Sequence, residues 1–130
     1  MTIKRGDVHW VDLGKCEEDK DEDEDQEKSS VVGHEQAGTR PGIVLQNDSD
    51  NQQAKTTVIV PTTSGSINES QHLNTIFIEA GTADLPNDSI ALCRQIRVVD
   101  VEERILDRIG EMPNLKLREI EASVEVVLGL

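Results

Sequence analysis

Aromatic side chains are nearly absent from the sequence, which has one Trp, one Phe and no Tyr among 130 residues. The core must therefore be built from Val, Ile and Leu, and any nucleic-acid site has few rings on which bases can stack. A chain of this length can bury one core, so we expect a single domain that spans residues 1–130.

Cysteine is also scarce. The two thiols, Cys16 and Cys93, do not provide a disulfide framework, and we expect both to be free in a reducing compartment. The sequence lacks the apolar core of a secretory signal and any apolar run long enough to cross a membrane. It also lacks a cluster with convincing metal-ligand spacing. We therefore expect a cytoplasmic protein with no membrane contact, no metal and no cofactor.

Positive charge is in short supply. The chain has 13 basic and 26 acidic residues and a net charge of −13, which argues against binding of polyanions through the overall surface charge. Nine acidic and three basic residues lie between Lys15 and Lys28, so this segment carries −6, and the remaining 17 acidic and 10 basic residues carry −7. Binding of a nucleic acid would have to depend on a few well-placed cations.

Short aliphatic runs separated by polar turns predict a mostly β fold. Turn-forming residues at 47–51 separate the second run from the third, and Pro61 is expected to end the third because it cannot donate a ladder hydrogen bond. Asp100 is placed to cap a short helical turn through Arg104. The expected strands cover residues 7–13, 42–46, 56–60, 75–78, 89–92 and 96–99.

The last segment has helical periodicity. We expect an amphipathic helix that begins at Pro113 or Asn114 and ends at Gly129. Its apolar side consists of residues spaced three or four apart along the chain: Leu117, Ile120, Val124, Val127 and Leu128. The predicted fold class is thus mostly β, closed by one C-terminal helix.

A glycine-hinged run at residues 33–41 (GHEQAGTRP) precedes the second expected strand. It places a carboxylate, an amide, a hydroxyl and a guanidinium at the mouth of a strand, where a rigid scaffold usually presents its chemistry. Judged from the residues alone, Glu35 and Arg40 are either a structural ion pair that pins the loop or part of a reactive site.

This loop and the elements around it resemble the MazF/PemK-like toxins over nearly the whole chain. The matching pieces occur in the family's order: residues 5–13 (RGDVHWVDL), 33–47, 58–64 (VIVPTTS), 95–100 (QIRVVD) and the terminal LGL. The resemblance implies a small SH3-like barrel of the CcdB/MazF type, usually homodimeric. It also implies the toxin of a type II toxin–antitoxin system, with a MazE-like antitoxin as partner.

Members of this family are metal-independent, sequence-specific endoribonucleases that cut single-stranded RNA. Attack by the 2′-hydroxyl leaves a 2′,3′-cyclic phosphate and a 5′-hydroxyl end. The resemblance makes Arg40 and Thr63 the catalytic pair, with Arg40 stabilising the phosphorane. Glu35 matches a family carboxylate that is either the base or the group that orients Arg40, and the division of acid and base work stays open.

Polar residues near this loop and the strand ends are candidates for substrate binding, although such residues also satisfy turns. His34 stands where the family usually has a small residue. The candidates are Gln36, Thr39, Asn47, Ser64, Gln95 and His34.

The chain departs from the family in an acidic, flexible insertion at about residues 15–32. The insertion either competes with RNA as a brake that weakens with salt or is an inert surface loop. Two other functions also remain open. One is a non-enzymatic toxin that binds gyrase, as CcdB does, and the other is a catalytically silent interaction module.

Overall fold

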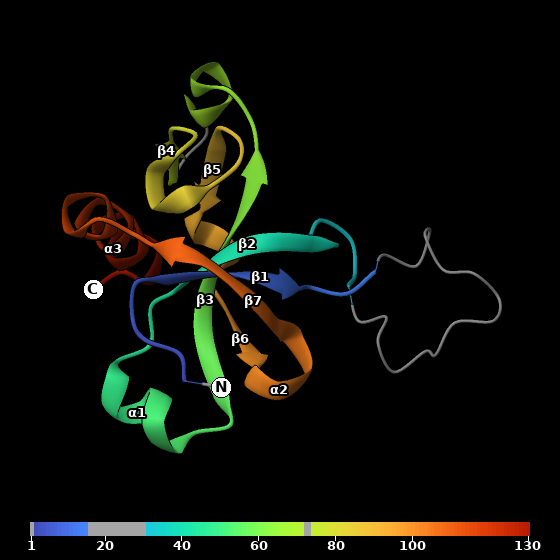
Figure 1. The fold of residues 1–130 in the computed structure, drawn as a ribbon. Helices are drawn as coiled ribbons and strands as arrows, with labels where there is room; N and C mark the ends of the chain where they lie inside the picture. The colour runs from blue at the N-terminus through green and yellow to red at the C-terminus, as the bar shows by residue number, and fades with distance from the viewer. Residues whose placement is uncertain (1, 16–30, 72–73) are drawn as a thin grey trace, which may run out of the picture.

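The structure is a computed structural model that describes residues 2–15, 31–71 and 74–130. Cys16 and most of the acidic insertion expected at about residues 15–32 lie outside these ranges, so both roles considered for the insertion remain hypotheses. The described chain confirms a mostly β fold with a C-terminal helix (Figure 1).

The described residues form strands, α-helices and short 3-10 helices. The strands are β1 (Asp7–Asp12), β2 (Thr39–Val44), β3 (Thr56–Ser64), β4 (Thr75–Ile78), β5 (Ser89–Leu92), β6 (Arg97–Asp100) and β7 (Ile105–Glu111). The α-helices are α1 (Asp48–Gln53), α2 (Val101–Arg104) and α3 (Asn114–Leu128). The 3-10 helices are η3 (Ile67–Gln71), η4 (Thr82–Asp84) and η5 (Cys93–Gln95).

The sheet is antiparallel and has the strand order β4-β5-β3-β2-β1-β7, with β6 also pairing with β3. In Figure 1, β1, β2 and β3 meet at the centre, β4 and β5 lie above them and β6 lies below. The outer strands β4 and β7 do not pair with each other within the described chain. The small barrel implied by the family resemblance is therefore an open, twisted sheet.

Two hydrophobic clusters lie on opposite faces of this sheet. Because successive residues of a strand point to opposite faces, β1 contributes Val8 to one cluster and Val11 to the other. The first cluster includes Ile120 of α3, which is fully buried. The second cluster is completed by Val99 of β6 and Ile105 of β7. The sheet is therefore held on both faces, which makes its strands a rigid base for the loops between them.

Strand β3 continues through Pro61, so the prediction that proline ends this strand is wrong. Along one edge, β3 pairs with β6 at residues 56–59 and with β5 at residues 62–64. Pro61 lies between these two ladders, where its missing N–H deprives neither of a donor. The continuation keeps Thr63 inside a strand, with its backbone fixed by Ile90 of β5.

One α-helix and one strand differ from the sequence-based predictions. Residues 47–51, expected to be a turn, lead into α1, where the Asn47 side chain caps the helix by accepting from the N–H of Asp50 at 2.8 Å. Helix α1 buries no residue and so has no hydrophobic period to reveal it. Strand β7 pairs with β1, but its exposed Leu106, Asp107 and Arg108 break the alternation that marks a strand.

The predicted helix signals are confirmed. Asp100 caps α2 by accepting from the N–H of Glu103 at 2.7 Å. Helix α3 begins at Asn114, and Gly129 ends it in the left-handed conformation, with φ of 72°. Its buried side includes Leu117, Ile120 and Val124, as the periodicity indicated. The last two residues of the predicted apolar side differ, since Val127 is partly exposed and Leu128 is exposed at the end of the helix.

Candidate functional site

Arg40 lies at the start of β2, where the loop of residues 31–38 enters the sheet. Its backbone pairs with Val11 of β1, and Gly38, with φ of 86°, makes the turn before it. Gly38 is fastened to the end of β1 by two backbone bonds. Its N–H donates to the carbonyl of Gly14 at 2.7 Å, and its carbonyl accepts from the N–H of Leu13 at 2.9 Å. The sheet itself therefore fixes the backbone beside Arg40.

The Arg40 guanidinium is held by two oxygen acceptors. Its Nε donates to the carbonyl of Ala37 at 3.2 Å, and its Nη1 donates to Oγ1 of Thr63 at 3.5 Å. The second contact lies just beyond the β2–β3 ladder, whose last pair is Gly42 with Pro61, two residues from both Arg40 and Thr63. Arg40 and Thr63, which were predicted to be a catalytic pair, are therefore in contact in the structure.

The half-buried Arg40 keeps an uncompensated positive charge. Within the described ranges, the ion pairs of basic side chains involve Arg5, His9, Arg108 and Lys116, and none involves Arg40. Its two structural acceptors are neutral, and a guanidinium has five N–H donors. Donors therefore remain for an anionic ligand, and a phosphate matches the fork geometry of arginine.

Glu35, the third predicted catalytic residue, is exposed and is not paired with Arg40 in the described structure. The cation that its charge affects is Arg97 of β6. Burial lowers the pKa of the Arg97 guanidinium, the positive charge of Arg104 lowers it further, and the Glu35 carboxylate opposes both. The structural ion pair considered for Glu35 and Arg40 is therefore not formed.

Arg97 and Arg104 converge on the end of β1. Nη1 of Arg97 donates to the carbonyl of Leu13 at 3.5 Å, and Nη1 of Arg104 donates to the carbonyl of Asp12 at 2.9 Å. Sequence reasoning did not single out either arginine as a site residue. Their convergence depends on the pairing of β6 with β3 and on the path of α2, and no local pattern encodes these arrangements.

Gln95, a predicted substrate-binding residue, contacts the loop through both ends of its side-chain amide. Its Oε1 accepts from the N–H of Gln36 at 3.2 Å, and its Nε2 donates to the carbonyl of His34 at 3.1 Å. Both loop residues were predicted to bind substrate, and each is held here through its backbone. The side chain of His34 is exposed, and that of Gln36 is partly exposed.

Thr39 and Ser64, two further predicted substrate-binding residues, line a small cavity of about 80 Å³ together with Arg40. The single Trp of the chain, Trp10, also lines it and supplies an aromatic surface that sequence reasoning did not assign to the site. Trp10 pairs with Pro41 of β2, so only the strand register could have placed it there. The remaining lining residues are Pro41, Thr62, Pro86, Asn87 and Ser89.

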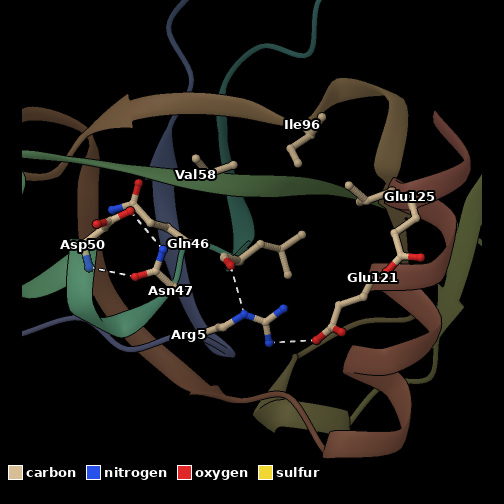
Figure 2. A pocket seen from close by; sticks show the side chains of 10 residues that line it. Arg5, Gln46, Asn47, Asp50, Val58, Ile96, Glu121 and Glu125 are labelled. Carbon is tan, nitrogen blue, oxygen red and sulfur yellow. Dashed lines mark hydrogen bonds and ion pairs between the residues drawn. The ribbon is translucent and has the colours of Figure 1, made fainter. Parts of the chain in front are cut away.

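Asn47 is not brought to this site. It follows the opposite end of β2, where its side chain caps α1, and it lines a separate groove of about 460 Å³ (Figure 2). In that groove, Arg5 forms an ion pair with Glu121 at 2.7 Å, and its Nε donates to the carbonyl of Leu45 at 3.0 Å. The groove contains none of the three predicted catalytic residues.

The described residues also bear on metal binding and on membrane insertion. They contain no group of three or more His, Cys, Asp or Glu side chains placed to hold a metal ion. None of the described helices combines the length and apolar character that a membrane span requires.

Comparisons with known proteins agree with one another. Residues 4–128 match the family model described as PemK-like, MazF-like toxin of type II toxin-antitoxin system. The chain is 32% identical over 128 residues to Endoribonuclease MazF of Staphylococcus saprophyticus, covering 98% of this chain and 92% of the relative.

Solved structures show the same fold. MazF (Form-I) from Deinococcus radiodurans superposes with a TM-score of 0.76 at 20% identity, covering 100% of this chain and 99% of that one. An endoribonuclease in complex with its cognate antitoxin, from a mycobacterial species, has a TM-score of 0.68 at 17% identity, covering 99% and 95% of the two chains. With a family match over nearly its whole length, this chain belongs to the PemK-like, MazF-like toxins of type II toxin–antitoxin systems.

Proposed function

We propose that this toxin, a homologue of an endoribonuclease, cleaves single-stranded RNA at specific sequences by a metal-independent reaction centred on Arg40. The observation that carries the proposal is the Arg40 guanidinium, which is oriented by the carbonyl of Ala37 and by Thr63 and has no carboxylate partner in the described chain. Such a group is preorganised to stabilise charge that develops on a phosphate.

In the proposed reaction, the ribose 2′-oxygen attacks the adjacent phosphorus, and the bond from phosphorus to the 5′-oxygen of the next nucleotide breaks. The products are a 2′,3′-cyclic phosphate and a 5′-hydroxyl end. Arg40 binds the phosphoryl oxygens, on which negative charge accumulates, and Thr63 holds the guanidinium in place. Glu35 accepts the 2′ proton, a role supported by its exposed carboxylate and by the positive charge of Arg97 nearby. The leaving 5′-oxygen takes a proton from water, and the proton held by Glu35 neutralises the hydroxide that remains.

The substrate is proposed to lie along the loop that precedes β2 and along the adjacent cavity of about 80 Å³. Thr39 and Ser64 line that cavity, and the exposed His34 and partly exposed Gln36 side chains extend from the loop. Asn47, which was predicted to bind substrate, is omitted from the proposed path because it caps α1 at the far end of β2. Binding would depend on local cations, since the chain as a whole is acidic.

We also propose that the chain forms a homodimer in the cytoplasm and is held inactive by a cognate antitoxin. A solved relative of the same fold is an endoribonuclease in complex with its cognate antitoxin. Exposed apolar side chains on α3, on β6 and at the C-terminus would be covered by such partners. They include Leu115, Val126, Leu128, Leu130 and Val98.

The test is incubation of the purified protein with a long, unstructured RNA in EDTA. Primer extension maps the cuts, and direct labelling by polynucleotide kinase identifies 5′-hydroxyl ends. We expect discrete cuts at a recurring sequence. Complete absence of cleavage, at low and moderate salt and after deletion of residues 16–29, would reject the nuclease. Inhibition of gyrase by the same preparation would then favour the CcdB-like alternative, in which the exposed end of α3 binds.

A further inference from the structure

We infer that Gln95 is a positioning residue, which holds the loop of residues 34–37 against the sheet and through it orients Arg40, and that it is not a reader of RNA bases. This inference rests on the proposed function. The role differs from the substrate contact that the sequence predicted for Gln95, and the two hydrogen bonds of its side-chain amide are the main observation.

The backbone of Gln95 is firmly placed. It is the last residue of η5, two residues after Cys93, which is fully buried in the cluster that includes Ile120 of α3. Two residues later, Arg97 enters β6 and pairs with Ile59 of β3. Gln95 therefore extends from a short link between two fixed points, and this placement suits a support better than a mobile contact.

Both polar atoms of the Gln95 side chain are used within the protein. Oε1 accepts from the N–H of Gln36 at 3.2 Å, and Nε2 donates to the carbonyl of His34 at 3.1 Å. The amide therefore bonds to the loop as the peptide group of a neighbouring strand would. It does so although Gln95 lies 59 residues after Gln36 and 61 residues after His34 in the sequence. One N–H and one lone pair of the amide stay available, but the two bonds to the loop fix the orientation of the side chain.

The loop transmits this support to Arg40. Ala37 directly follows Gln36, and its carbonyl accepts from Nε of Arg40 at 3.2 Å. On the other side of Ala37, Gly38 is tied to Gly14 and Leu13 of the β1 end. The carbonyl that aims the guanidinium therefore lies between two attachments. One is made by backbone atoms, and the other depends on the single side chain of Gln95.

Without the amide, the loop keeps its attachment at Gly38 but loses the one at residues 34 and 36. Arg40 then retains its charge and its strand position, while the direction of Nε is no longer fixed. Because small errors in the placement of a catalytic group reduce the rate of the chemical step, we expect kcat to fall about 10- to 100-fold with little change in KM. The RNA sequence that is cut should stay the same.

The test compares Gln95→Met, which keeps the side-chain length and removes both hydrogen bonds, with Gln95→Glu, which keeps an acceptor for the Gln36 N–H. Gln53→Met, at an exposed position in α1, is the matched control. Melting temperatures identify any variant that fails to fold. The first readout, made without RNA, is amide hydrogen exchange of Gln36, with the N–H of Gly38 as internal reference.

We expect faster exchange at Gln36 in Gln95→Met, near wild-type exchange in Gln95→Glu and in the control, and no change at Gly38. Steady-state cleavage should then show the loss in kcat for Gln95→Met with unchanged cut sites. Unchanged exchange at Gln36 in Gln95→Met would overturn the inference. So would faster exchange accompanied by wild-type kcat, and so would an altered cut sequence with protected Gln36, which is the signature of a base reader.

The proposed function can fail separately from this inference. If the wild-type protein cuts no RNA, the nuclease is rejected. The exchange data still decide whether Gln95 holds the loop, because that measurement contains no substrate.

Discussion

Arg40 and Thr63 meet across the β2–β3 pair, with Nη1 of the arginine 3.5 Å from Oγ1 of the threonine. Each residue lies next to the end of its strand, and its backbone is still fixed by pairing, Arg40 with Val11 and Thr63 with Ile90. The distance is at the outer limit of a hydrogen bond, and we expect it to shorten when a phosphate draws the guanidinium into the site.

Removal of the Thr63 hydroxyl should slow cleavage. Thr63→Val deletes the acceptor that orients Arg40 while keeping the β-branched shape that suits a strand, so we expect kcat to fall about 10-fold or more, as for a lost hydrogen bond to a charged group. Thr63→Ser should retain most of the activity. Steady-state kinetics on a short RNA measures both, with Thr56→Val, exposed at the start of β3, as control. Equal rates for Val and Ser at position 63 would contradict this role.

The proposed base predicts a large effect of Glu35→Gln. The substitution keeps the size of the side chain and removes the proton acceptor, so the rate should fall about 100-fold or more. Glu111→Gln, an exposed change in β7, should leave the rate unaltered. Single-turnover rates as a function of pH are the measurement. A Glu35→Gln variant that is as fast as the wild type would show that the carboxylate is not the base.

The docking of β7 onto η4 predicts that Gly110 tolerates no side chain. A Cβ at this position would overlap the carbonyl oxygen of Ala83, which belongs to backbone and cannot rotate away. We expect Gly110→Ala to lower the free energy of unfolding by about 3 kcal/mol. Gly33→Ala has open space around the added Cβ and only an unfavourable φ of 60°, so it should cost about 1 kcal/mol. Urea unfolding measures both variants. A Gly110→Ala protein as stable as Gly33→Ala would contradict the predicted overlap with Ala83.

Burial raises the pKa of the Cys93 thiol above its ordinary value. Above the usual thiol pKa of about 8.5, the unfolded chain loses this proton while the folded chain keeps it. The contribution of the thiol to stability is therefore complete below that pH and is lost as the pH rises toward the raised pKa.

We accordingly expect the wild type to lose stability more steeply than Cys93→Ala as the pH rises above about 8.5. Chemical unfolding across this range gives the two curves. Cys93→Ala also leaves a small cavity that lowers stability at every pH. Only the difference between the two slopes of unfolding free energy against pH therefore reports on the thiol. Parallel curves would show that the thiol does not titrate differently in the two states.

Most of the fold could be predicted because its signals are local. The β4 and β5 boundaries, the Asp100 cap and the Gly129 end of α3 all follow from residues next to them in the chain. Strand β7 escaped prediction because it presents three consecutive exposed residues, 106–108, and is stabilised by its partner β1. Helix α1 escaped because capping, and not an apolar face, defines it.

The site could be predicted only in part, for the same reason. The family resemblance nominated Arg40, Thr63 and Glu35, and the β2–β3 register then brought the first two together. It could not show that Glu35 lies near Arg97, because that proximity depends on where β6 and the loop meet. Its position at a strand end made Asn47 a predicted substrate-binding residue, although the intervening length of β2 separates it from Arg40.

Catalysis by Arg40 is tested best by the single-turnover rate of RNA cleavage in EDTA. The proteins compared are the wild type, Arg40→Ala, Arg40→Lys and the exposed α3 control Arg118→Ala. We predict a loss of about 1,000-fold for Arg40→Ala and no loss for Arg118→Ala. Arg40→Lys should keep partial activity, because an ammonium lacks the planar fork of a guanidinium. A folded Arg40→Ala protein that cleaves at the wild-type rate would contradict catalysis by Arg40.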